Sequence, residues 1–173
     1  MAKKHYRFGD SASAPAGARA LLPAMFKLYL AQGRKLAGHS PEPAAINGFR
    51  LETKVFRYTL ELFRPCYGPG LERRLEYLKE IQNHLGAISD YAATGKLIAA
   101  SLPGQSPERL KLERILTQRM RRKWAEFDRY WRLTFDTPAE ERRWLNYLGA
   151  SKQGHGGAVL LPHSVTRGPA NSV

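Results

Sequence analysis

Apolar residues recur at helical spacing along most of this 173-residue chain, and this periodicity is the strongest constraint on its fold. Leu71, Leu75, Leu78, Ile81 and Leu85 follow one another every three or four residues, which places them on one face of a helix. Segments rich in glycine and proline separate such runs. Runs of alternating apolar and polar residues are too short for strands and lack hairpin turns. The pattern therefore predicts an all-α protein, an antiparallel helical bundle.

The boundaries of the predicted helices come from proline, glycine and capping residues. Pro23 is expected in the first turn of the first helix. Gly86 is expected to end the third, and Ser89 or Asp90 to cap the fourth. Ser106 is expected to cap the last long helix. The predicted helices are about 14–37, 42–63, 71–85, 91–102, 107–135 and a short closing helix at 138–148 that packs through Trp144 and Leu148.

These helices make one domain, residues 14–148, which is long enough to bury a core. Residues 1–13 are polar and small, and we expect a flexible N-terminus. Glycine, serine, histidine and proline dominate residues 149–173, for which we expect a flexible tail.

One predicted helix carries cations beside its apolar face rather than opposite to it. Arg50, Lys54 and Arg57 are spaced by four and three residues and share one side with Asn47. At 100° per residue this basic arc of roughly 100° adjoins the apolar arc. We therefore expect these cations to project into a groove between helices. Their mutual repulsion indicates that an anion neutralises them. The apolar arc consists of Phe49, Phe56, Leu60 and Phe63.

This run resembles the helix of the CHAD family, the conserved histidine α-helical domain, with the pattern His-x-x-Arg-x-x-x-Lys-x-x-Arg-Tyr. Arg50, Lys54, Arg57 and Tyr58 match it, and Asn47 stands at the histidine position. Residues 75–90 resemble the second element of the family, Leu-x-x-Leu-Gln-x-x-Leu-Gly-x-x-x-Asp. The resemblance extends over residues 20–148.

The resemblance implies an α-helical bundle that binds inorganic polyphosphate through a basic groove. The side chains implied are those of the motif, in which Tyr58 and Asn47 donate neutral hydrogen bonds. Asn47 keeps a donor but loses the cation that a histidine can become. Family members usually contain two four-helix units, whereas this chain has residues for one. We therefore expect a homodimer in which two grooves face each other.

The charge balance supports a polyanionic partner. Lysine and arginine number 28 against 15 acidic residues, for a net charge of +13. Such a balance favours polyphosphate, nucleic acid or an anionic membrane surface. Within 107–135, Arg119 and Lys123 flank the apolar arc and are candidates for the same groove. Arg114, Arg121 and Arg132 are predicted to point away from it.

The residues for catalysis are not apparent. Acidic residues are mostly single and interleaved with cations, and no glycine-rich phosphate loop or histidine metal spacing occurs. Cys66 is the only cysteine, so no internal disulfide is expected. We expect no enzyme activity, no metal and no cofactor. The sequence contains no apolar stretch of membrane-spanning length and no secretory signal, which predicts a cytoplasmic protein.

Three alternatives to polyphosphate binding remain open. A basic helical protein can bind nucleic acid, although no known DNA-reading or RNA-reading motif is present. An enzyme of phosphate metabolism is less favoured because the carboxylates it needs are missing. The basic arc can also be a solvated helix face.

Overall fold

The computed structural model describes residues 13–37, 42–104 and 106–150, and in these ranges the protein is all-α, without strands. The predicted N-terminal segment and C-terminal tail lie outside the described residues, apart from Ser13, Gly149 and Ala150. The elements are α1 (Ala14–Leu36), α2 (Pro43–Leu62), the 3-10 turn η1 (Arg64–Cys66), α3 (Leu71–Ser101), α4 (Pro107–Tyr130), the π-helical turn η2 (Trp131–Phe135) and α5 (Pro138–Gly149).

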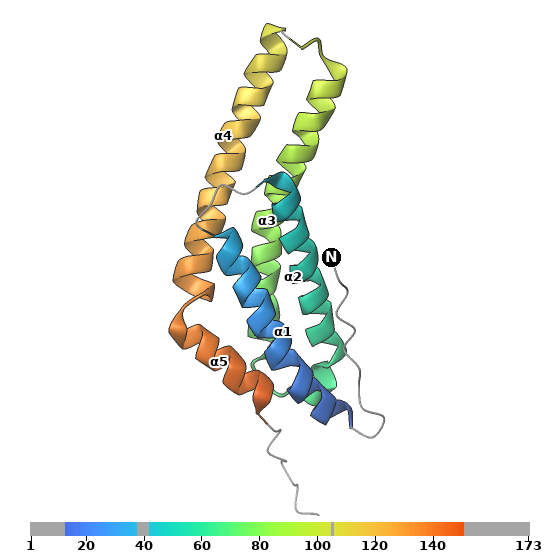
Figure 1. Ribbon diagram of the computed structural model, residues 1–173, viewed down its shortest axis with the longest axis vertical. Coiled ribbons are helices and arrows are strands. Elements are labelled where there is room, and N and C mark those ends of the chain that lie inside the picture. The colour runs from blue at the N-terminus through green and yellow to red at the C-terminus, as the bar shows by residue number, and fades with distance from the viewer. Residues whose placement is uncertain (1–12, 38–41, 105, 151–173) are drawn as a thin grey trace, which may run out of the picture.

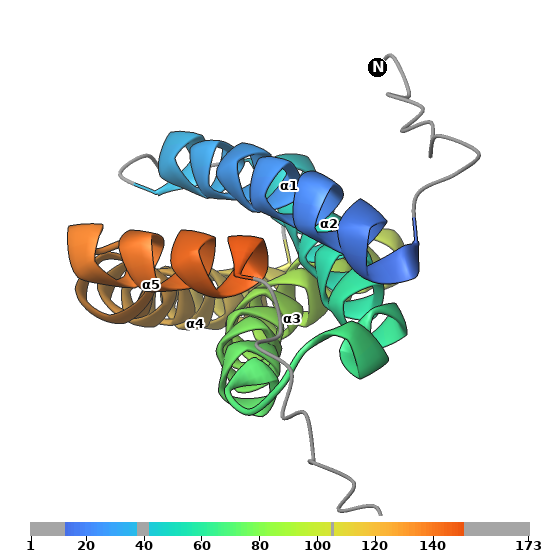
Figure 2. The same ribbon diagram turned by 90° about the horizontal axis from the view of Figure 1, so that it is seen from below.

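The helices form a bundle from which one pair extends. α1 packs against α2 and α5, and α3 packs against α2 and α4 (Figures 1 and 2). The far ends of α3 and α4 rise together beyond the other helices. We call this pair, residues 89–101 and 107–123, the arm; no residue in it is buried. The core therefore lies in the lower part of the bundle.

Most helix starts follow the sequence signals. Proline stands in the first turn of α1, α2, α4 and α5. The Ser106 hydroxyl accepts a hydrogen bond from the Arg109 amide at 3.2 Å, which confirms the predicted cap. Pro23 was predicted in a first turn and instead lies inside α1, whose first turn contains Pro15. Leu22 and Phe26 are fully buried on either side of Pro23, and their packing offsets the backbone hydrogen bond that proline cannot donate.

The break predicted after residue 85 is wrong, because α3 runs without interruption through Gly86. Ser89 does not cap a new helix: its hydroxyl donates to the Leu85 carbonyl within the same one, at 2.9 Å. Asp90 is likewise inside α3, and its carbonyl accepts from the Thr94 hydroxyl. Leu85 and Ile88 are buried on both sides of the glycine. Their burial outweighs the roughly 1 kcal/mol by which glycine disfavours a helix.

An aromatic cluster fills the core. Phe26 stacks on Trp144 with ring centroids 4.8 Å apart, and Trp144 meets Phe135 edge-on at 5.6 Å. Tyr29 stacks on Phe56 at 5.2 Å. The predicted packing of α5 through Trp144 and Leu148 is confirmed, since both are fully buried. These contacts join α1, α2, η2 and α5 through rings that bury large apolar areas.

The chain widens into a π turn where α4 meets this cluster. The Asp136 amide donates to the Trp131 carbonyl at 2.7 Å, five residues back. The wider turn lets both Trp131 and Phe135 face the core, where each is fully buried. Asp136 then accepts hydrogen bonds from the Trp131 indole at 3.2 Å and from the Arg34 guanidinium at 2.7 Å. The turn is therefore anchored to α1.

Gly33 of α1 is where Trp131 needs room. A Cβ atom at Gly33 would lie 2.1 Å from the indole ring of Trp131, which is too close for any contact. A methyl group here must displace the Trp131 ring, which is fully buried in a closely packed core.

We predict that Gly33→Ala lowers the free energy of unfolding by about 1–3 kcal/mol because it overpacks the core. Gly48→Ala is the matched control, since Gly48 lies within α2 and its Cβ would meet nothing within 4 Å. That change should stabilise the protein by about 0.5–1 kcal/mol through helix propensity. Urea unfolding of both variants measures the difference. A Gly33→Ala protein as stable as the parent would contradict this packing.

Candidate anion-binding site

The predicted cations of α2 lie on one flank of the helix. We call Arg50, Lys54 and Arg57 the basic row. The buried line of α2 separates this row from the opposite flank, where Glu52 and Val55 face α1 across a small groove. The row is therefore on the side of α2 away from α1. The buried line consists of Ile46, Phe49, Thr53, Phe56 and Leu60.

Two cations of the row have no acidic partner within the described part of the chain. Neither Arg50 nor Lys54 forms an ion pair there. Arg50 is half-buried, and its Nε is buried without a hydrogen-bond acceptor. An unsatisfied buried donor costs about 1–3 kcal/mol, and this cost is relieved if Arg50 changes its side-chain conformation to bind an oxyanion. Arg50 and Lys54 are thus available to an anion.

Arg57 differs from its neighbours because it is already paired. Its Nη1 lies 2.8 Å from Glu61 Oε1, and its Nε is buried without an acceptor. Both side chains of this pair are partly exposed, so their mutual attraction is modest. Arg57 therefore attracts an anion less strongly than Arg50 and Lys54 do, because Glu61 offsets its charge.

Tyr58 contributes its ring rather than a hydrogen bond to any described side chain. Arg57 Cζ lies 4.7 Å from the ring centroid and Lys54 Nζ lies 5.6 Å from it. Cation–π attraction therefore holds Lys54 and Arg57 against one exposed ring, whereas Arg50 makes no such contact in the described residues. Asn47 is exposed one turn before Arg50, at the edge of the same flank.

Arg119 and Lys123 lie away from the basic row. They line a pocket of about 270 Å³ together with Tyr91 and Arg122, on the arm formed by α3 and α4. No residue of α2 lines this pocket. The structure therefore does not bring these two cations into one pocket with the basic row, because α3 separates α4 from α2. Arg114, Arg121 and Arg132 are exposed, and Arg132 pairs with Asp128.

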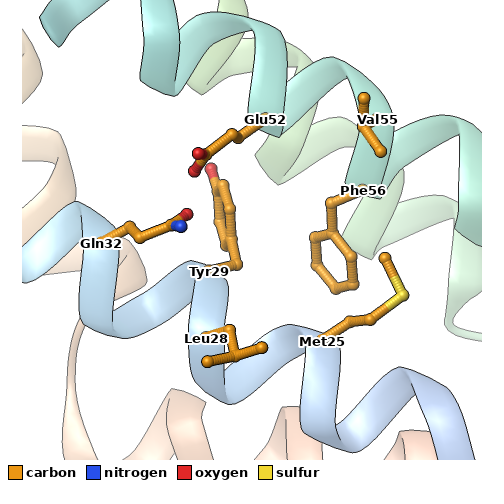
Figure 3. A pocket seen from close by; sticks show the side chains of 7 residues that line it. All are labelled: Met25, Leu28, Tyr29, Gln32, Glu52, Val55 and Phe56. Atoms are coloured by element: carbon orange, nitrogen blue, oxygen red, sulfur yellow. The ribbon is translucent and has the colours of Figure 1, made fainter. Parts of the chain in front are cut away.

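The groove between α1 and α2 is unsuited to anions. Its volume is about 210 Å³, and Figure 3 shows Met25, Leu28, Val55 and Phe56 around it. Glu52 is the one acid or base among its lining residues, and partial burial raises the pKa of this carboxyl. An apolar groove with a carboxylate at its rim favours an apolar partner.

Two kinds of feature do not occur in the described ranges: clusters of metal-ligand side chains and helices that could span a membrane. No three histidine, cysteine or acidic side chains there gather into a group that could hold a metal ion. None of the helices described is both long and apolar enough to cross a bilayer.

A family model for the CHAD domain matches residues 2–99. The chain belongs to the CHAD domain family. The match includes α1, α2 and nearly all of α3, and both sequence elements that resemble this family lie within it. No curated protein and no solved structure matches the chain. The site in this CHAD domain is therefore described from the residues of this chain, without a related structure for comparison.

Sequence reasoning missed two residues that the CHAD domain brings together on the arm. Arg122 lies three residues after Arg119 on α4, so the helical spacing alone predicts that the two side chains are neighbours. The place of Tyr91 in this pocket could not be predicted from the sequence, because its approach to α4 depends on α3 continuing as one helix past Gly86.

Proposed function

We propose that this CHAD domain binds inorganic polyphosphate through the basic row of α2, and that it does so without catalysis. The observation that carries the proposal is the pair Arg50 and Lys54. They lie one turn apart, match the family motif, and form no ion pair with any described residue. A polyphosphate chain carries a negative charge on each phosphate, so it can meet each cation of the basic row in turn.

The chemistry of each residue suits a repeating phosphate. An arginine can grip two oxygens of one phosphate, whereas a lysine acts as a point charge. The three cations rise about 10 Å along α2, so an extended chain laid beside the helix meets them in turn. The Nε atoms of Arg50 and Arg57 are buried donors without an acceptor among the described residues. Asn47 adds a neutral donor at one end.

Nucleic-acid binding is the second candidate. The net charge of +13 favours it, but the basic row lies beside the core line of α2 rather than on an open face. An enzyme of phosphate metabolism is the weakest candidate, because it needs a metal held by carboxylates or a nucleophile with a base. The expected cytoplasmic location stays a prediction.

We predict that Arg50→Ala and Lys54→Ala each weaken polyphosphate binding by about 1–3 kcal/mol. Arg57→Ala should cost less, because Glu61 already offsets its charge. Arg121→Ala is the matched control: it removes the same charge from an exposed site on α4. Calorimetric titration measures the affinities, and circular dichroism checks that each variant is folded. Equal losses in all four variants would show diffuse charge attraction rather than a site.

A competition separates polyphosphate from nucleic acid. We predict that log affinity for polyphosphate falls roughly linearly with log salt, by analogy with counterion release. At about 0.15 M salt, polyphosphate should displace a fluorescent DNA duplex, since exposed charges are then largely screened. Fluorescence anisotropy measures both ligands. Duplex DNA that binds as tightly as polyphosphate at that salt concentration would favour the nucleic-acid alternative.

We propose further that two copies of the chain associate through the outer face of α2. Leu51, Val55, Tyr58 and Leu62 follow one another at helical spacing on this face and are 48%, 59%, 48% and 75% exposed. The apolar groove between α1 and α2 continues the surface at Val55. An apolar stripe of this kind is typical of an interaction site. We call these four residues the α2 stripe.

The charges beside the α2 stripe favour a second copy as its partner. Lys54 and Glu61 lie on the same flank of the stripe. An antiparallel two-fold pairing brings the same flank of each copy together, so Glu61 of one copy lies near the basic row of the other. This pairing also sets the two basic rows side by side. Repulsion between two chains of charge +13 opposes association, and a bound polyanion relieves it.

We predict a dimer that strengthens with polyphosphate and weakens at low ionic strength without it. Val55→Glu should abolish the dimer, because it places a carboxylate in the middle of the α2 stripe. Leu133→Glu is the control, since Leu133 is 74% exposed on η2, away from this face. Light scattering at several protein concentrations measures the mass. A monomer under every condition would overturn the dimer.

A further inference from the structure

The arm contains a second cluster of cations, separate from the basic row. Arg119, Arg122 and Lys123 fall on neighbouring turns of α4, and Tyr91 of α3 faces them. Together they line a pocket of about 270 Å³. That size admits a few phosphate groups, and two different helices supply the lining. The cluster thus lines an open pocket, in which Arg119 and Arg122 are exposed while Tyr91 and Lys123 are partly buried.

A single carboxylate serves two of these three cations. Glu126 accepts from Lys123 Nζ at 2.7 Å and from Arg122 Nε at 3.1 Å. Hydrogen bonds from Lys123 and then Arg122 lower the pKa of Glu126, so it is a carboxylate at neutral pH. Arg119 forms no ion pair in the described ranges. The pocket therefore holds more positive charge than its own residues neutralise.

The competing ligand chemistries differ in how well they use this arrangement. Glu126 already supplies one carboxylate to these cations, so a ligand with a single carboxylate would gain little from binding beside it. A phosphate group presents up to three oxygens to Arg119, Arg122 and Lys123 at once, and two arginines bind it bidentately. The Tyr91 hydroxyl supplies a further neutral donor.

We propose that Tyr91, Arg119, Arg122 and Lys123 form a second phosphate-binding site that takes a short phosphate chain such as pyrophosphate. Glu126 holds Arg122 and Lys123 while the site is empty and competes with the incoming anion. The site acts independently of the basic row, because no α2 residue lines it. The site can therefore bind phosphate whether or not the basic row binds polyphosphate.

Pyrophosphate is the probe that tests this site, measured by calorimetry on the full chain. The Arg50→Ala/Lys54→Ala background removes the basic row as a competing site, and pyrophosphate should still bind in it, since distant sites are independent. Arg119→Ala in the same background should weaken it at least about tenfold, as expected for a charge-assisted hydrogen bond. Glu126→Gln should tighten it, because it removes the competing charge and keeps the side-chain shape.

Arg121→Ala is the control, since it removes an equal charge one residue from Arg122 on the side of α4 away from the pocket. Its affinity should not change. Circular dichroism melts confirm that each variant folds. Loss of pyrophosphate binding in the Arg50→Ala/Lys54→Ala background would assign the ligand to the basic row instead. Absence of binding at millimolar pyrophosphate, an unchanged Arg119→Ala, or equal affinity for a single-stranded oligonucleotide would overturn the proposal.

Discussion

The contact between Trp131 and Gly33 holds the bundle together. The indole ring occupies the space that any side chain at residue 33 would need, so η2 can approach α1 this closely only because residue 33 is glycine. The π turn at Trp131–Phe135 directs a second ring, Phe135, into the same core. Asp136 then ties the turn to Arg34 of α1. α5 begins just after this junction, at Pro138, and the far ends of α3 and α4 form the arm.

The core line of α2 gives its two flanks and its outer face different properties. One flank carries the basic row, and the other borders an apolar groove whose one acid is Glu52. Between them, on the outside, lies the α2 stripe. Because these surfaces share one helix, anion binding and self-association involve adjacent side chains, and Lys54 and Tyr58 lie where the two surfaces meet.

Neighbouring carboxylates decide which of the many cations are available to a ligand. Each of four cations contacts an acid three or four residues away along the chain: Arg57, Arg122, Lys123 and Arg132. Arg50 and Lys54 do not, and Arg50 has a buried Nε without an acceptor. The net charge of +13 explains attraction to polyanions in general, whereas this local pairing distinguishes a site from a charged surface.

The sequence alone determined what depends on near neighbours: the all-α class, most helix starts, and the alignment of Arg50, Lys54 and Arg57, because helical spacing fixes which residues share a face. Tertiary packing decided the rest. Burial of Leu85 and Ile88 kept α3 continuous through Gly86, and burial of Leu22 and Phe26 held Pro23 inside α1. The path of α3 between α2 and α4 placed Arg119 and Lys123 in a pocket apart from the basic row. Local propensities of about 1 kcal/mol yield to the larger free energy of burying several large side chains, which no short stretch of sequence contains.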